Sequence, residues 1–133
     1  MNRLNGTSPL ERYQINPDTT IHPGTLVALN SDGNAVPAAD TADLKVIGIA
    51  RNIENDEVEV FDGIVSLNNA AEGAALTRAD RGSAVYVVDA ETVGKTSTNH
   101  IPAGILVDLY GGDVYIACDP VALAIAGLAS KSA

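Results

Sequence analysis

Gly24-Thr-Leu-Val-Ala-Leu-Asn-Ser-Asp-Gly33 opens a pattern of short strands that this chain contains twice. The first copy continues with Val46-Ile-Gly48-Ile-Ala50 and Asp56-Glu-Val-Glu-Val-Phe-Asp62. The second copy consists of Gly82-Ser-Ala-Val-Tyr-Val-Val88, Pro102-Ala-Gly104-Ile-Leu-Val107 and Asp113-Val-Tyr-Ile-Ala-Cys-Asp119. The copies are offset by 58 residues at the first segment, 56 at the central glycine and 57 at the third segment. Two copies of a β motif indicate a closed pseudo-two-fold barrel or sandwich rather than a solenoid.

Each copy has the residue pattern of antiparallel strands. The turn Ser31-Asp-Gly-Asn34 separates two strand-like segments, as in a β-hairpin, and Tyr110-Gly-Gly-Asp113 has the same role in the second copy. Val58 and Val60 alternate with acidic residues, so their face of the strand is expected to lie in the core.

The central glycines, Gly48 and Gly104, are expected where a neighbouring backbone or large side chain approaches closely. Apolar residues make up 46% of the chain, but it has one Phe and no Trp, and most of its apolar residues are Ala and Val. Such small side chains suit the thin core of a narrow barrel.

The chain divides into three segments. Residues 1–23 contain three prolines and lack periodicity, which predicts an extended N-terminal arm. Residues 24–119 hold both copies of the repeat, and residues 120–133 form a tail whose apolar run fits either a strand or a short helix. The fold class predicted is therefore all-β: a single compact β-barrel or β-clip-like domain with an internal pseudo-two-fold repeat and an extended N-terminal arm.

The composition argues against several classes of partner. Eight basic and 17 acidic residues give a formal net charge of -9, which repels nucleic acids and anionic membranes. The single cysteine, Cys118, excludes an internal disulfide and a zinc site with several thiolates. Because no secretory leader and no apolar run of about 20 residues is present, we expect a soluble protein made in the cytoplasm.

The residues able to carry chemistry are few and scattered. His22 and His100 lie in loop-like sequence near prolines, and neither belongs to a metal-binding or catalytic motif. The acids of residues 54–59 lack the spacing of a calcium loop and indicate a solvated strand edge instead. Gly82-Ser83 resembles the self-cleavage site of pyruvoyl-dependent decarboxylases, but it aligns with Gly24-Thr25 and is interpreted as a strand-opening turn. The sequence therefore predicts no enzyme activity, no cofactor and no metal.

The pattern resembles the small capsid decoration, or cement, proteins of tailed bacteriophages. The matching segments are Gly24–Val27, Asp32-Gly33, Val46–Ala50, Gly82–Val87 and Ala103–Asp108. The resemblance covers roughly residues 24–118. It implies a domain on the outer surface of an icosahedral head, synthesised in the host cytoplasm, that bridges subunits of the major capsid protein as a homotrimer and stabilises the DNA-filled head.

The resemblance also implies that a terminal arm reaches across the capsid lattice. An arm with few core-forming residues can add strand-like contacts to a partner, and three arms in a trimer would act together. Residues 1–23 would fill this role, and their apolar side chains are the candidate contacts: Leu4, Leu10, Tyr13, Ile15 and Ile21.

Two other classes of function compete with this interpretation. The first is a stand-alone β-barrel that binds a small ligand or glycan, which the shortage of aromatic residues disfavours. The second is a self-processing or otherwise cryptic enzyme, which the lack of a convergent acid, base and nucleophile disfavours.

Overall fold

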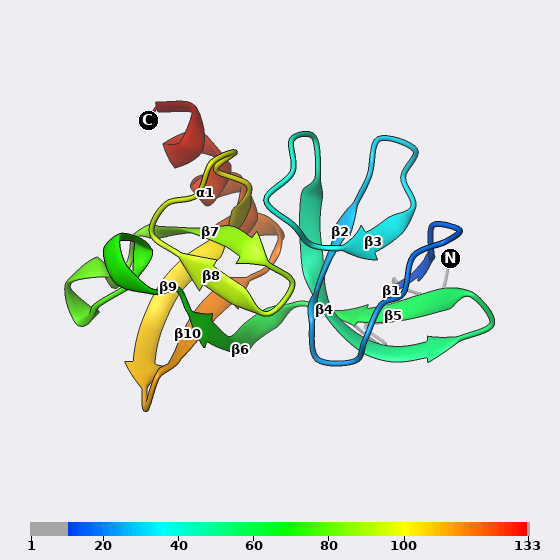
Figure 1. Cartoon of the computed structure of the whole chain (residues 1–133), viewed down its shortest axis with the longest axis horizontal. Coiled ribbons are helices and arrows are strands. Elements are labelled where there is room, and N and C mark those ends of the chain that lie inside the picture. Colours follow the sequence, from blue (N-terminus) through cyan, green and yellow to red (C-terminus); the bar gives the residue numbers. More distant parts are fainter. Residues whose placement is uncertain (1–10, 133) are drawn as a thin grey trace.

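The computed structural model of the chain describes residues 11–132 and confirms a predominantly β fold with a closed barrel. Figure 1 shows two β lobes side by side and one helix behind the second lobe. The elements are β1 (Glu11–Gln14), β2 (Leu26–Leu29), β3 (Ala35–Pro37), β4 (Lys45–Glu54), β5 (Glu57–Phe61), β6 (Gly63–Asn69), η2 (Glu72–Ala74), η3 (Arg78–Asp80), β7 (Ala84–Asp89), β8 (Thr92–Gly94), β9 (Pro102–Tyr110), β10 (Asp113–Cys118) and α1 (Pro120–Ser132).

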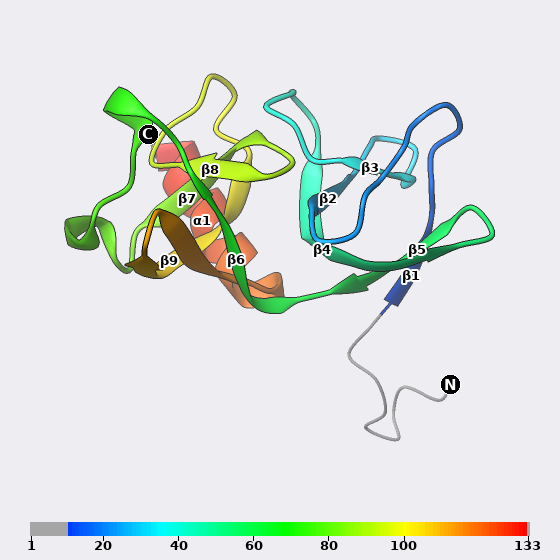
Figure 2. The ribbon, with the colours of Figure 1, turned by 60° about the horizontal axis from the view of Figure 1, so that its bottom comes forward.

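Each copy of the repeat forms a sheet of its own. The first lobe is a five-stranded sheet in the order β1-β5-β4-β2-β3, and the second lobe is a closed barrel in the order β10-β6-β8-β7-β9. The expected barrel is thus present, but it contains the second copy together with β6, and the first copy forms the other sheet. Figure 2 shows that β5 continues into β6, so that one extended segment joins the lobes.

The strand pairs of the two lobes repeat in detail. Val27 pairs with Gly48 and Val85 pairs with Gly104, and each pair is followed by a β-bulge at the same position. The sequence offsets of 58 and 56 therefore describe true structural equivalents.

The offset of the last strand differs from the expected 57. Ile49 pairs with Phe61 and Ile105 pairs with Ala117, which makes the offset 56. The two-residue turns that precede these strands, Asn55-Asp56 and Gly111-Gly112, have positive φ at both positions, as in type I′ hairpins. Matching Asp56 to Asp113 placed the strands one residue out of register, and such a slip exchanges the two faces of a strand.

The corrected register aligns the buried residues of β5 and β10. Val58 becomes equivalent to Val114, Val60 becomes equivalent to Ile116, and all four side chains are buried. The expectation that Val58 and Val60 face the core is confirmed.

The N-terminal segment from Glu11 onward belongs to the first lobe. β1 pairs with β5, and Ile15 forms a parallel bridge with Ala35 at the start of β3. The barrel has the same arrangement, because β6 pairs with β10 and Asn69 lies parallel to Val93. Equivalent backbone hydrogen bonds follow these pairs. The amide of Asn16 donates to the carbonyl of Ala35, and the amide of Ala70 donates to the carbonyl of Val93. Both bonds are 2.9 Å long. β1 is therefore the counterpart of β6, and the part of the expected arm that the structure describes, residues 11–23, belongs to the first lobe.

The two lobes share a hydrophobic core. The larger core cluster combines the barrel interior with five buried residues of the first lobe: Leu26, Ala28, Ala38, Val46 and Ile49. A smaller cluster fills the first lobe itself around Val27, Val58 and Val60. A backbone hydrogen bond from Leu26 to Ala90, 2.8 Å long, also joins β2 to the turn between β7 and β8. The described residues thus form one domain with two lobes.

The C-terminal tail, which the sequence left open between strand and helix, is the helix α1. Asp119 caps its N-terminus, because the Asp119 carboxylate accepts a hydrogen bond of 2.8 Å from the amide of Ala122. Ala122 and Ala126 are buried on the side of α1 that packs mainly against β9 and β7. The small side chains on this side of α1 allow it to lie close to the barrel.

Gly48 and Gly104 lie at close contacts, as the sequence predicted. Their φ angles are +149° and +148°, a region that favours glycine. A Cβ atom at Gly48 would overlap the carbonyl oxygen of Phe61, and one at Gly104 would overlap the carbonyl oxygen of Ala117. The obstacle is backbone in both lobes, so a neighbouring side chain cannot relieve it by rotating.

Gly104→Ala should therefore lower the free energy of unfolding by about 3 kcal/mol, through steric overlap and a disfavoured φ angle. Gly73→Ala is the matched control, because Gly73 lies in η2 with open space around its Cβ position and no positive φ. Urea denaturation of both variants measures the difference. Equal stability of Gly104→Ala and the control would mean that the contact between β9 and β10 does not constrain this position.

Candidate interaction surface

The two histidines lie far apart in the sequence, and each makes contacts with nearby residues. His100 Nε2 lies 3.2 Å from the hydroxyl of Thr96, and its ring meets the ring of Tyr86 edge to face with centroids 5.0 Å apart. His22 is exposed, and its carbonyl accepts a hydrogen bond of 2.7 Å from the hydroxyl of Thr25. Within residues 11–132, no group of three or more His, Cys, Asp or Glu side chains is placed to hold a metal ion.

The acidic strand edge is organised by one arginine. The Arg12 guanidinium lies 3.3 Å from a carboxylate oxygen of Glu57, 3.6 Å from one of Glu54 and 4.0 Å from one of Glu59. These side chains lie on β1, β4 and β5, and all are at least partly exposed to solvent. The cluster therefore joins neighbouring strands across the sheet, and each exposed pair is expected to stabilise the fold only slightly.

The single thiol is inaccessible. Cys118 is fully buried at the end of β10. Burial, together with the nearby carboxylates of Asp119 and Asp62, raises the pKa of its thiol to about 12. A thiol in this state is a poor nucleophile at neutral pH.

Gly82-Ser83 forms the strand-opening turn that the repeat predicted. The φ angle of Gly82 is +86°, and that of Gly24 is +87°. The amide of Gly82 donates a hydrogen bond to the carbonyl of Leu106, and the amide of Gly24 donates one to the carbonyl of Ala50. Both bonds are 2.8 Å long. The resemblance to a self-cleavage site is thus explained by the geometry that both copies need to begin their first strand.

The candidate arm residues that the structure describes lie in the domain. Ile21 is buried in the smaller core cluster, and Tyr13 and Ile15 are half-buried against it. They were predicted as contacts of a free arm, but the pairing of β1 with β5 holds this segment on the first lobe. Leu4 and Leu10 lie outside the described residues.

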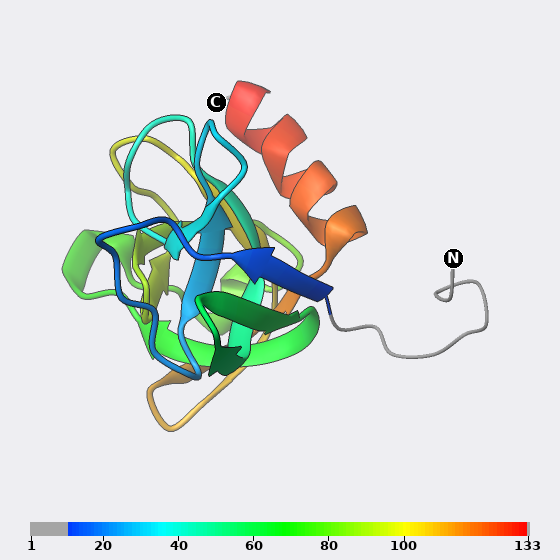
Figure 3. The same cartoon turned by 90° about the vertical axis from the view of Figure 1, so that its right-hand side faces the viewer.

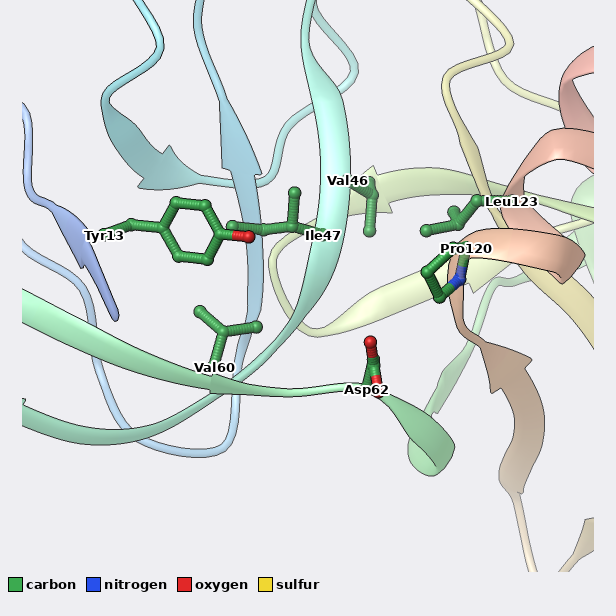
Figure 4. A pocket seen from close by; sticks show the side chains of 7 residues that line it. All are labelled: Tyr13, Val46, Ile47, Val60, Asp62, Pro120 and Leu123. Atoms are coloured by element: carbon green, nitrogen blue, oxygen red, sulfur yellow. The ribbon is translucent and has the colours of Figure 1, made fainter. Parts of the chain in front are cut away.

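A small cleft lies where the first lobe meets the start of α1 (Figure 4). Its volume is about 240 Å³, below the range of about 300–1,000 Å³ that is usual for small-molecule sites. Asp62 is its only charged residue, and the other lining residues are Tyr13, Val46, Ile47, Val60, Pro120 and Leu123. A cleft of this size and lining suits a single apolar side chain better than a ligand.

Two larger hollows lie at the surface. One, of about 590 Å³, lies between the β2–β3 turn and the loop before β4, where Ser31, Gly33 and Asp43 are exposed. The other, of about 490 Å³, lies beside α1 and includes Ile105 and Ile125 together with Lys95. Both are wide open to solvent, whereas a specific small-molecule site encloses most of its ligand.

The most distinctive surface feature is the outward side of α1. Val121, Ile125 and Leu128 are 69%, 52% and 66% exposed, although all three are large and apolar. The other exposed large apolar residues among those described are Ile64, Val88, Val107 and Tyr110. We call Val121, Ile125 and Leu128, with the exposed Ala124 between them, the α1 face. This face could not be predicted from the sequence while the tail remained open between strand and helix. The spacing of four and three residues between its large side chains was the signal that could have found it.

A carboxylate joins loops of the two lobes. Asp40, which precedes β4, accepts hydrogen bonds from the amides of Thr98 (2.9 Å) and Asn99 (2.8 Å), which precede β9. The side chain of Asn99 donates in return to the Asp40 carbonyl over 2.8 Å. Burial alone would raise the pKa of Asp40, but these hydrogen bonds to its ionised form outweigh burial and lower it.

Comparisons with known proteins identify no relative. No family model matches the chain, and neither the curated proteins nor the solved structures contain a match. Among the described residues, no helix is both long and apolar enough to cross a bilayer.

Asp40→Ala should lower the free energy of unfolding by about 1 kcal/mol at neutral pH, because two solvent-exposed backbone amides exchange a charged acceptor for water. The folded pKa lies below the ordinary value of 3.8, so this stabilisation is complete above that value and is lost as pH falls through the folded pKa. The gap between wild type and variant should therefore narrow in denaturation curves below about pH 4. Asp32→Ala, on the exposed β2–β3 turn, is the control. A gap of constant size down to pH 2 would show that the Asp40 charge does not hold the loops together.

Proposed function

We propose that this protein is a capsid decoration protein of a tailed bacteriophage, which binds the outer surface of the icosahedral head and stabilises the DNA-filled particle. The proposal extends the resemblance of residues 24–118 to that group. The observation that supports it best is that the α1 face is apolar and exposed to solvent. The side chains that could take part in catalysis are, in contrast, buried or already bonded to neighbouring groups. Cys118 is buried, Arg12 pairs with carboxylates, and Asp40 is hydrogen-bonded to two backbone amides.

The proposed partners are the major capsid protein and further copies of this chain, as a homotrimer. A decoration protein works by contact area across subunit boundaries and needs a rigid body rather than a reactive centre. A shared core between two lobes supplies such a body, because a load applied to one lobe is carried to the other. The net charge of -9 agrees with a place outside the capsid shell, where contact with the packaged DNA is not needed.

The capsid-contact segment is proposed to precede β1. Residues 11–23 contribute β1 and the buried Ile21 to the first lobe, so they are unsuited to reaching a partner. Residues 1–10 contain Leu4 and Leu10, the two candidate contacts that remain. A segment of ten residues spans at most about 35 Å when fully extended, which limits how far the proposed contact can lie from the domain.

The test is co-sedimentation of the purified protein with expanded and unexpanded phage heads that lack a decoration protein. We expect saturable binding to expanded heads. Removal of residues 2–10 should weaken that binding at least tenfold and leave the unfolding midpoint unchanged, because β1 is intact. Removal of residues 2–22 is the contrasting variant, and it should destabilise the domain by taking away β1 and Ile21.

Three results would count against parts of this proposal. Absence of binding to any head would overturn the function and favour a ligand- or glycan-binding module. Full-strength binding without residues 2–10 would overturn the role of that segment alone. A normal unfolding midpoint without residues 2–22 would contradict the place of β1 in the first lobe.

A further inference from the structure

The small cleft between the first lobe and α1, which runs along one flank of the molecule (Figure 3), has one carboxylate in an otherwise uncharged lining. Figure 4 shows the side chain of Asp62 directed into the space between β4 and α1. Among residues 11–132, Asp62 forms no ion pair with a lysine or arginine, and its carboxylate accepts no hydrogen bond. The Arg51 guanidinium lies over the ring of Phe61, 5.3 Å from its centroid. The charge of Asp62 is therefore not neutralised within the described part of the chain.

The repeat shows that the fold does not require a charge at this position. With the offset of 56 residues given by the strand pairing, Asp62 is equivalent to Cys118. Cys118 is fully buried in the barrel, where it pairs with Gly63 of β6. The first lobe has a half-buried carboxylate beside an open cleft instead. A carboxylate that faces apolar walls loses part of its hydration, and a cation entering the cleft would offset that loss with a charge-assisted hydrogen bond.

The walls of the cleft determine the shape of the cation that fits. Two buried and two half-buried side chains form most of the apolar lining: Val46 and Val60, and Ile47 and Leu123. These walls suit one aliphatic side chain, and Asp62 adds the requirement of a positive charge. Lysine meets both conditions, because its four-carbon stem is apolar and its ammonium is a compact charge. The planar guanidinium of arginine has five donors to satisfy and fits a single carboxylate in an apolar cleft less well.

We infer that this cleft binds a lysine side chain of a partner protein, with the ammonium at Asp62 and the stem against the apolar walls. The net charge of -9 supports a partner with a basic surface, because the field of this chain attracts positive surfaces and repels negative ones. The inference rests on the proposed function only for the identity of the partner, which would be a subunit of the major capsid protein. One side chain contributes little affinity alone, so the cleft is one anchor within a wider contact.

NMR titration of the isotope-labelled full chain tests the cleft without heads. The probe is n-butylammonium chloride, which reproduces the lysine side chain, and n-butanol is the neutral probe of the same shape. We expect saturable shifts at the amides of Ile47, Asp62 and Leu123, with a dissociation constant on the order of 10 mM for so small a ligand. At equal ionic strength, n-butanol and ammonium chloride should each bind about tenfold more weakly, because the first lacks the charge and the second lacks the stem.

A matched pair of variants assigns the charge recognition to one residue. Asp62→Asn keeps the shape of the side chain and removes its charge. It should weaken binding of n-butylammonium about tenfold and leave binding of n-butanol unchanged. Asp32→Asn, on the exposed β2–β3 turn, makes the same change away from the cleft and should alter neither affinity. Melting curves verify that both variants are folded.

Equal affinity for n-butylammonium and n-butanol, or for the wild type and Asp62→Asn, would overturn the inference. Failure of n-butylammonium to shift the cleft residues would also overturn it, unless a chain without residues 2–10 binds the probe. That result would assign the cleft to this chain's own N-terminal segment, which contains Arg3, and would equally exclude a partner lysine. A protein that binds heads but not the probe would retain the proposed function and lose only this site. Probe binding without head binding would retain the site and lose the identity of the partner.

Discussion

The close approach of backbones at Gly48 and Gly104 is the constraint on which the curvature of both lobes depends. Each glycine lies beside a β-bulge, and its missing side chain leaves room for the carbonyl of the neighbouring strand. Bulges increase the local twist of a strand, and here the bulge and the glycine occur at the same place in β4 and β9. The twisted strand can then bring the two edges of a five-stranded sheet together. In the barrel the edges pair fully, and in the first lobe they meet only at the bridge between Ile15 and Ala35.

The same repeat explains how the lobes are stacked and why α1 is needed. Leu26 and Ile49 lie on the first lobe and contribute to the core that it shares with the barrel. Their equivalents in the barrel, Ala84 and Ile105, border the hollow beside α1. The barrel covers one surface of the first lobe, and α1 lies at the equivalent surface of the second lobe. Its inner side is suited to this by buried alanines, and its outer side carries exposed apolar residues.

The sequence was most informative where a local pattern determines the structure. The repeat, the strand alternation of Val58 and Val60 and the crowding at Gly48 all follow from short-range periodicity or from a residue type that one backbone conformation requires. The register of the last strand was missed because two turns of equal length, Asn55-Asp56 and Gly111-Gly112, differ in composition and obscured their equivalence. β1 was missed because its pairing with β5 spans more than 40 residues and leaves no periodic signal in Glu11–Gln14. The α1 face needed the helix to be known first.

High-resolution imaging of expanded heads saturated with this protein would test the central claim most directly, namely that it is an interaction protein of the outer capsid surface. The account predicts two-lobed density on the outer surface at three-fold and local three-fold positions. Heads that carry no added density at saturating protein would contradict the function itself.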